Sequence, residues 1–417
     1  MENLDNEIEN IRNIVEVCNS LKGSFLEATN YLEIESKFYE RDFSVGLIGS
    51  TGSVSRSIIN HLLGNYKNAK INLVSTKYNL LKNDYALDEL IGIVKSGDLE
   101  VDFIELKERI NIFKSINSTI KESTGIKRFL DSNFILMCAR NTKESFKTHV
   151  ERNDEYKFNK DFVVETAKKL NKYEKGIILN ITNPIEPTSE LIAKYSNIPR
   201  NRIGGITSTD SIRLRRSILN VLNRKYPEED FRENDIREVY VLGEHGPSMV
   251  QLLSLIKIKD EQFLKNFYYN KNIRSEIKKG LVSTPNIIQR SPIKNIKYPT
   301  IATIETIHNL LKNEVVPISS YDGDCFITVP TKSTNLEGKI DNILLPQLDF
   351  LTKISDQERK RFYFSKSEIL KNLYELDLIS ENKFFEVLKR MNKNKQISKL
   401  RRGFLLEKYM KEAIKFY

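Results

Sequence analysis

Short apolar runs alternate with amphipathic stretches through the first half of the chain. Between the runs, apolar positions recur at the spacing of a helix, as in residues 57–63. The runs have the length of buried strands and lie at residues 43–48, 71–74, 101–104, 134–137 and 176–181. Because parallel strands need long crossovers and helices are the usual crossovers, this alternation predicts a parallel sheet with helices on both faces.

The pattern changes after Pro184, where helices mix with hairpin-like pairs of strands, for example residues 238–242 against 250–256. We interpret this change as the start of a second domain, of α+β type. Residues 1–40 show helical apolar spacing among many acidic residues, and residues 372–417 are helical and basic. Both ends are therefore predicted to be helical extensions.

Composition favours two globular domains over an exported or membrane protein. With 417 residues, of which 40% are hydrophobic and 29% charged, the chain can bury two ordinary cores. Its three cysteines, Cys18, Cys138 and Cys325, are too scattered for a disulfide framework or a metal site. The acidic N-terminus has no apolar signal segment, and no apolar run is long enough to span a bilayer. We expect a cytoplasmic protein that does not enter membranes.

The net charge of +10 raises the question of a nucleic-acid partner. No nucleic-acid-binding motif accompanies the charge, so the sequence does not favour such a partner. Much of the excess lies near the C-terminus, at Lys389, Arg390, Lys393, Lys395, Lys399, Arg401 and Arg402. This cluster is either a basic contact patch or a solvated helix face, and it could pair with the acidic segment 1–40 of the same or a neighbouring subunit.

A glycine-containing turn follows the first predicted strand. It leads into a helical stretch, where backbone N–H groups can approach a pyrophosphate at the helix N-terminus. The candidate cofactor-binding residues of this turn are Gly49, Ser50, Thr51, Gly52, Ser53 and Val54. A plain strand–helix turn has the same pattern, so the glycine pair alone is a weak signal.

Two features depart from the dinucleotide-binding fingerprint. Ser55 stands where a third glycine is usual. The second strand is followed by Ser75, Thr76 and Lys77, where an acidic residue normally binds the ribose 2′-hydroxyl of NAD. Lys77 offers a positive partner for the 2′-phosphate of NADP, so the choice between NAD and NADP stays open.

Three further motifs follow in order. They are Asn183-Pro184-Ile185-Glu186, Thr209-Asp210-Ser211-Ile212-Arg213-Leu214-Arg215 and Leu242-Gly243-Glu244-His245-Gly246-Pro247-Ser248. In order and spacing they resemble the lactate/malate dehydrogenase family, from about residue 43 to about residue 370. The resemblance implies the α/β class, with a Rossmann-type dinucleotide-binding domain over residues 41–184 and a substrate domain over 185–371. It also implies hydride transfer between a nicotinamide cofactor and a 2-hydroxy or 2-keto acid, in a homodimer or homotetramer.

Hydride transfer to a 2-keto acid needs a proton donor for the carbonyl oxygen, a charge partner for that donor and a clamp for the carboxylate. His245, Asp210 and Arg213 are of these three types. Histidine titrates near neutral pH, a carboxylate can fix its tautomer, and arginine can hold a carboxylate with a bidentate fork. By the resemblance, Asn183 orients the substrate carbonyl and contacts the cofactor, and Thr300 lines the pocket. Each residue alone has an ordinary structural explanation, and only the combination indicates a site.

In the family, a mobile loop after the fourth strand closes over the substrate and brings an arginine to the carbonyl. Here the segment 139–153 is one residue short, and the arginine position holds Phe146 or Lys147, depending on the end from which it is counted. Lys147 can supply a point charge without the planar fork of arginine. Asn141, at the position that reads the far end of the substrate, is neutral, so a monocarboxylic or bulkier 2-hydroxy acid is favoured over malate. A displaced loop that turns Arg140 inward would reverse this preference.

Cys138 replaces the glycine that usually precedes this loop, where it would crowd the cofactor groove beside Ala139. Burial as a small apolar residue is a more ordinary role for it than reactivity.

Two hypotheses about function stay open. The first is a divergent NAD(P)-dependent 2-hydroxy-acid oxidoreductase, and the alternative is a catalytically impaired family member that acts as a binding or regulatory protein.

Overall fold

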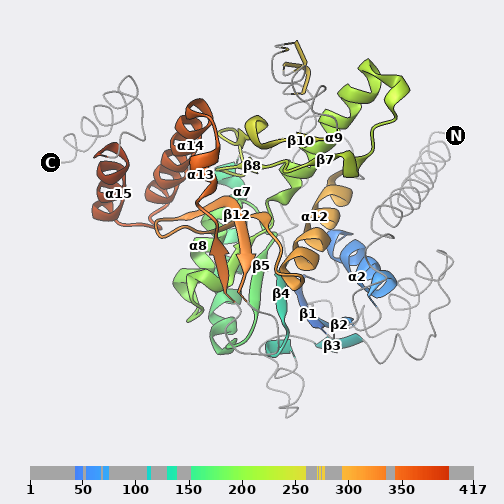
Figure 1. Cartoon of the computed structure of the whole chain (residues 1–417). Helices are drawn as coiled ribbons and strands as arrows, with labels where there is room; N and C mark the ends of the chain where they lie inside the picture. Colours follow the sequence, from blue (N-terminus) through green and yellow to red (C-terminus); the bar gives the residue numbers. More distant parts are fainter. Residues whose placement is uncertain are drawn as a thin grey trace, which may run out of the picture.

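The computed structural model describes residues 43–49, 53–66, 69–74, 110–113, 129–138, 152–259, 270, 272–273, 275–277, 294–334 and 343–393. These residues form a nine-stranded sheet with helices on both faces (Figure 1). The predicted α/β class is confirmed. The predicted strand at 101–104 and the predicted helical segment 1–40 lie outside the described residues.

Six parallel strands form the first part of the sheet. They are β1 (Phe43–Ile48), β2 (Ala69–Val74), β3 (Ile110–Phe113), β4 (Phe134–Met137), β5 (Ile177–Asn180) and β6 (Ile203–Gly205). Their order, β6-β5-β4-β1-β2-β3, reverses between β1 and β4, as in a Rossmann-type sheet. The apolar runs predicted β1, β2, β4 and β5, whereas the four-residue strand β3 and the three-residue strand β6 were missed.

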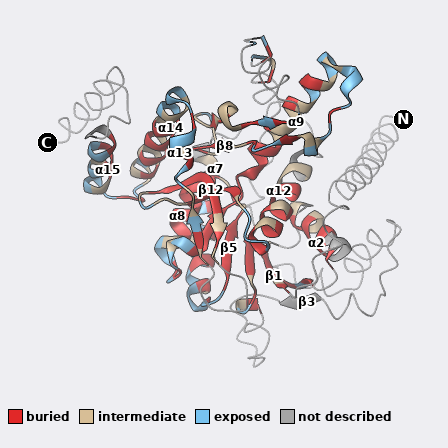
Figure 2. Ribbon diagram, viewed as in Figure 1, coloured by how far each residue is buried: buried red, intermediate tan, exposed pale blue. Residues whose placement is uncertain are grey.

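Alternating side chains of the strands enter two cores on opposite faces of the sheet, because successive residues of a strand point to opposite sides. In β4, Phe134 and Leu136 belong to one core, and Ile135 and Met137 belong to the other. The helices α2 (Ser53–Asn65) and α12 (Lys294–Leu311) pack into the first core, and α7 (Arg152–Lys169) and α8 (Ile185–Tyr195) into the second. The centre of the sheet is almost entirely buried (Figure 2).

The strands of the second half continue the same sheet. Ser319 pairs with Gly205 of β6, and three antiparallel strands follow at that edge: β11 (Val316–Tyr321), β12 (Phe326–Ser333) and β13 (Leu344–Pro346). Two short antiparallel pairs form separate small sheets, β7 (Ile236–Arg237) with β10 (Lys257–Ile258) and β8 (Val241–Leu242) with β9 (Val250–Gln251). The β8–β9 pair confirms part of the predicted hairpin, whereas Leu253–Leu255 form a short 3-10 helix instead of continuing the strand. The division into domains at residue 184 stays a prediction.

Three helices close the described chain, α13 (Phe350–Lys353), α14 (Asp356–Glu375) and α15 (Glu381–Lys393). The predicted boundary at residue 371 falls inside α14. Four apolar side chains of α15 are buried in the core that α14 also enters, namely Phe384, Val387, Leu388 and Met391. The described part of the predicted C-terminal extension is therefore packed onto the core. Within the described ranges, no helix combines the length and the apolar character needed to cross a membrane.

Candidate active site

The loop that carries His245 begins directly after β8. Gly243 has φ +90°, a conformation that glycine adopts without strain, and it exchanges two backbone hydrogen bonds of 3.0 Å with Thr328 of β12. The backbone N–H of His245 donates to Glu186 Oε1 of α8 at 2.6 Å. The loop is therefore fixed from two sides, by the sheet and by α8.

His245, Asp210 and Arg213 lie together in the structure. Asp210 lies in the first turn of α9 (Ser208–Lys225), and its Oδ2 is 2.6 Å from His245 Nδ1. Its Oδ1 accepts a hydrogen bond from Arg213 Nη1 at 3.2 Å. The side chains of His245 and Asp210 are 17% and 7% exposed. Because Nδ1 faces a carboxylate, the proton is assigned to Nδ1, which leaves Nε2 to exchange a proton with a bound molecule.

The guanidinium of Arg213 has capacity to bind a further group. Its carbon lies 5.4 Å from the ring centroid of Tyr298 on α12, a cation–π contact. Its Nε is buried and has no hydrogen-bond partner among the described residues. Thr300, two residues after Tyr298, is buried at 3% exposure. Helices α9 and α12 pack against each other, so the predicted carboxylate clamp and the predicted pocket residue lie on neighbouring elements.

The turn after β5 is held by hydrogen bonds of buried polar side chains. Asn180 Oδ1 accepts from the backbone N–H of Thr182 at 3.0 Å, and Asn180 Nδ2 donates to Thr188 Oγ1 at 2.8 Å. The carbonyl of Asn183 accepts from Asn159 Nδ2 of α7 at 2.8 Å. Asn183, which is partly buried, thus occupies a well-fixed turn.

Sequence reasoning missed the part that Glu186 plays. This side chain is 2% exposed and holds the backbone of His245, which is 59 positions later in the chain. Its place in the Asn183-to-Glu186 motif was the only signal for it. Glu186 also lines a small pocket between α8 and α14, together with Pro184, Pro187, Glu244, Ile369, Asn372 and Leu376.

The carboxyl ends of β1 and β4 form the crevice where a Rossmann-type sheet binds a dinucleotide. Gly49, at φ +82°, turns the chain after β1, and Ser55 Oγ donates to the Gly49 carbonyl at 2.9 Å. Helix α2 begins at Ser53 and has no acidic residue in its first turn, so no carboxylate opposes a phosphate there. Val54 is partly buried. These residues fit a dinucleotide in the crevice.

Cys138 follows β4 and lies beside the end of β1 and the start of α2. Its backbone N–H donates to the carbonyl of Ile48 in β1 at 3.0 Å. Burial raises the pKa of the Cys138 thiol to about 12, against a smaller opposing effect of a hydrogen bond with Ser55. The thiol is therefore protonated at neutral pH, which agrees with packing and not with nucleophilic reactivity.

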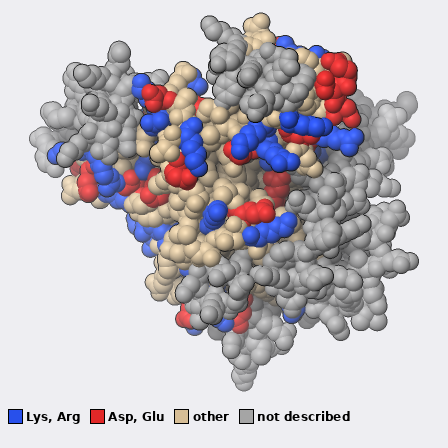
Figure 3. Space-filling model, viewed as in Figure 1, with Lys and Arg blue, Asp and Glu red and all other residues tan. Residues whose placement is uncertain are grey.

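Several predicted site residues lie outside the described residues: Ser50, Thr51, Gly52, Ser75, Thr76, Lys77, Ala139, Asn141 and Lys147. The structure therefore places only part of the predicted cofactor and substrate contacts. The described residues contain no group of three or more metal-ligating side chains. On the face shown in Figure 3, acidic and basic side chains are interspersed over the described part of the surface.

The chain is similar to proteins named lactate dehydrogenase and malate dehydrogenase. No protein-family model matches the chain. The chain is 26% identical over 320 residues to L-lactate dehydrogenase of Fervidobacterium nodosum, covering 73% of this chain and 94% of that protein. It is 25% identical over 308 residues to malate dehydrogenase of Methanothermobacter marburgensis, covering 72% and 82%.

Solved structures give the same fold. Malate dehydrogenase of Cryptosporidium parvum matches with a TM-score of 0.61 at 18% identity, over 81% of this chain and 100% of that one. Lactate dehydrogenase of Eimeria maxima, solved with NADH and oxamate, matches with a TM-score of 0.61 at 19% identity, over 81% and 95%. The resemblance seen in the sequence is thereby confirmed, at the distance of a divergent relative.

Proposed function

We propose that the chain is a NAD(P)-dependent oxidoreductase that transfers a hydride between a nicotinamide cofactor and a 2-hydroxy or 2-keto acid, with His245 as general acid and base. The contact of 2.6 Å between His245 Nδ1 and Asp210 Oδ2 carries this proposal. A histidine oriented by a carboxylate is typical of a proton-transfer site. Arg213, one helical turn after Asp210, keeps N–H donors for a bound carboxylate. Relatives named lactate and malate dehydrogenase support the same class of reaction.

Each residue of the cluster has one task in this proposal. The bound nicotinamide supplies or accepts the hydride. His245 Nε2 gives a proton to the substrate carbonyl oxygen during reduction and removes it during oxidation. Asp210 holds the imidazole in the tautomer that makes this transfer feasible. Arg213 binds the substrate carboxylate through its remaining N–H donors.

The cofactor would lie across the crevice between β1 and β4. The turn at Gly49 and the start of α2 would hold its pyrophosphate, with Ser50, Thr51, Gly52, Ser53 and Val54 around it. Cys138, Ala139 and Asn183 would lie on the nicotinamide side. Ser75, Thr76 and Lys77 would meet the adenosine ribose, and Lys77 favours a 2′-phosphate there. Affinity for NADPH relative to NADH tests this last point.

The substrate in this proposal is a monocarboxylic 2-keto acid or its hydroxy form. Asn141 brings no countercharge for a second carboxylate, and Lys147 supplies a point charge at the carbonyl. Thr300 lines the pocket beside Arg213. We further propose a cytoplasmic homo-oligomer, since lactate and malate dehydrogenases commonly form dimers or tetramers.

The first experiment is a titration of the purified protein with NADH and with NADPH, in the presence and absence of a panel of 2-keto acids, followed by nicotinamide fluorescence. We expect saturable binding that one keto acid strengthens, and turnover that His245→Gln abolishes while binding persists. His308→Gln is a control, because His308 is a buried packing residue whose Nδ1 lies 3.1 Å from Tyr66 Oη. Absence of binding at about millimolar cofactor would contradict the proposal and favour the binding or regulatory alternative.

A further inference from the structure

One face of α14 lies along the loop that carries His245. Near the start of the helix, Glu358 Oε1 accepts from the backbone N–H of Ser254 at 3.0 Å. Two turns later, Ser365 Oγ accepts from the backbone N–H of Glu244 at 2.7 Å. Because these contacts fall on one side of one helix, α14 can determine where the residue before His245 lies.

Ser365 is the residue of α14 that contacts the backbone of the His245 loop. It is fully buried, and a Cβ built on Gly243 would come within 2.3 Å of its Oγ, so the backbone of the loop packs directly against the side chain of Ser365. The hydroxyl of Ser248 donates to Glu244 Oε2 at 2.6 Å, and it lies 3.0 Å from Ser365 Oγ. Since the Ser248 proton is used toward Glu244, the Ser365 hydroxyl is the donor to Ser248. The three residues thus close a ring of hydrogen bonds beside His245.

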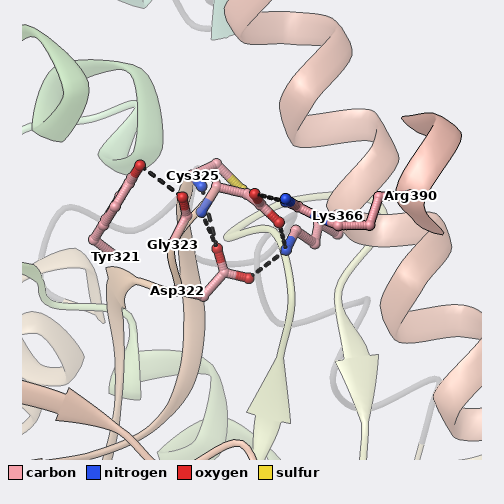
Figure 4. A network of polar contacts seen from close by, with 7 residues as sticks. Tyr321, Asp322, Gly323, Cys325, Lys366 and Arg390 are labelled. Atoms are coloured by element: carbon pink, nitrogen blue, oxygen red, sulfur yellow. Dashed lines mark hydrogen bonds and ion pairs between the residues drawn. The ribbon is translucent and has the colours of Figure 1, made fainter. Parts of the chain in front are cut away.

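The residue next to Ser365 fixes α14 to the sheet. Lys366 Nζ donates to Asp322 Oδ2 and to Asp324 Oδ2, each at 2.6 Å, in the turn between β11 and β12 (Figure 4). Burial alone lowers the pKa of Lys366, but the attraction of Asp322 and the other groups around it outweighs burial and holds the pKa above its usual value. Lys366 therefore stays charged, and moving α14 would leave buried charges without partners.

The last described helix completes this brace. Arg390 of α15 forms an ion pair with Asp324, the carboxylate that Lys366 also binds (Figure 4). Tyr374 of α14 and Phe384 of α15 stack with ring centroids 5.0 Å apart. The same strand β12 that follows the turn also pairs with Gly243 through Thr328. The His245 loop, α14, and β12 with the turn before it are therefore each connected to the other two by hydrogen bonds or ion pairs.

We infer that Ser365 is a positioning residue for His245, and that the ion-pair brace of Lys366, Asp322, Asp324 and Arg390 holds Ser365 in place. Ser365 acts through the backbone of Glu244 and the hydroxyl of Ser248, and it does not touch the substrate. This inference rests on the proposed catalytic role of His245, but the placement of the His245 ring can be measured without turnover.

The test compares Ser365→Ala with Ser367→Ala in the full chain. Ser367 is a matched control because it is on the same helix and 4% exposed, and its hydroxyl donates only within the helix, to the Phe364 carbonyl at 2.6 Å. Two positions apart on a helix, the residues point about 200° apart, so Ser367 faces away from the loop. The chain has four histidines, so the ring signals of His245 can be identified by NMR with a His245→Gln reference.

We expect Ser365→Ala to shift or broaden the His245 ring signals and to speed amide exchange of residues 243–250 by about tenfold, because a buried N–H loses its acceptor. Ser367→Ala should leave both as in the wild type. Ser365→Cys, which keeps the size and weakens the acceptor, should give an intermediate result and serves if Ser365→Ala fails to fold. In turnover assays, Ser365→Ala should lower kcat with little change in KM.

The inference would be overturned if Ser365→Ala kept the His245 ring signals and the amide exchange of the wild type. It would also be overturned if Ser367→Ala changed both as much as Ser365→Ala does. A wild-type protein without turnover would contradict the proposed function and leave this comparison intact. The two proposals can therefore fail separately.

Discussion

The His245 cluster and the cofactor crevice differ in how closely they follow the family pattern. In the cluster, Asp210, Arg213 and His245 have the expected types, and both contacts between them are within 3.2 Å. At the crevice, Ser55 and Cys138 stand where the family pattern has glycine. One region therefore matches the family pattern in its side chains, while the other departs from it.

The difference has a chemical reason. The proton transfer and carboxylate binding proposed for the cluster need particular side-chain atoms at fixed distances, so this chemistry does not tolerate a change of residue types. A pyrophosphate is held mainly by backbone N–H groups, which do not depend on the side chain. Ser55 illustrates this freedom, because its hydroxyl fits inside the helix start and donates to the carbonyl of Gly49. A changed fingerprint is thus compatible with a working cradle.

The largest expected effect is that of Asp210→Asn. The amide keeps the size of the carboxylate but cannot hold the imidazole in the same tautomer, so kcat should fall by about three to four orders of magnitude. Steady-state reduction of the preferred keto acid measures this, with Asp230→Asn as control because the Asp230 side chain is 80% exposed. Retention of wild-type kcat in Asp210→Asn would remove Asp210 from the cluster.

A second histidine, His61, lies in a buried environment, whereas His245 lies beside the carboxylate of Asp210. His61 of α2 is buried, and desolvation lowers its pKa from 6.5 to about 4. The His61 imidazole binds a proton near pH 6.5 in the unfolded chain but only near pH 4 in the folded chain. Its contribution to the free energy of unfolding is therefore complete above pH 6.5 and is lost as the pH falls toward 4. The loss is on the order of 3 kcal/mol.

Urea unfolding of the wild type and of His61→Asn at pH 7.5 and pH 4.5 measures this contribution. The wild type should lose more stability between the two pH values than the variant does. An equal loss in both proteins would show that His61 is not the source of the acid sensitivity.

Arg213→Lys removes the guanidinium fork of the proposed substrate clamp while keeping its charge. Lysine cannot form the bidentate contact, so kcat/KM should fall by about a hundredfold, largely through KM for the keto acid. The Kd for the cofactor should not change. Arg224→Lys is the control, since the Arg224 side chain is 65% exposed. If the two variants behave alike, Arg213 does not bind the substrate carboxylate.

The smallest effect is expected at the cofactor crevice. Ser55→Gly restores the usual glycine, yet it removes a buried hydrogen bond and places glycine in a helix, so stability should fall by roughly 1–2 kcal/mol. The Kd for the preferred cofactor should stay within about threefold, because the cradle is made of backbone. A large gain in cofactor affinity would mean that Ser55 hinders binding, and the contrast between the two regions would then be wrong.

The elements that the sequence predicted best are those with a strong local pattern. Apolar runs gave β1, β4 and β5 nearly to the residue, and the three motifs gave the members of the His245 cluster. The strands β3 and β6, of four and three residues, were missed, because they are too short for periodicity to separate them from other stretches of the chain. The C-terminal segment was expected to be an extension, yet α15 buries Phe384 and Met391 on the core.

The sequence by itself determined the residue types of the candidate site, since the proposed hydride transfer to a keto acid requires a histidine, a carboxylate and an arginine, and their spacing is readable along the chain. Only the tertiary structure decided what surrounds them. Glu186 reaches the backbone of His245 across 59 positions, and Ser365 reaches that of Glu244 across 121. Local periodicity records which face of an element is buried, but not which distant element packs on that face, because that choice depends on the shape of the assembled core.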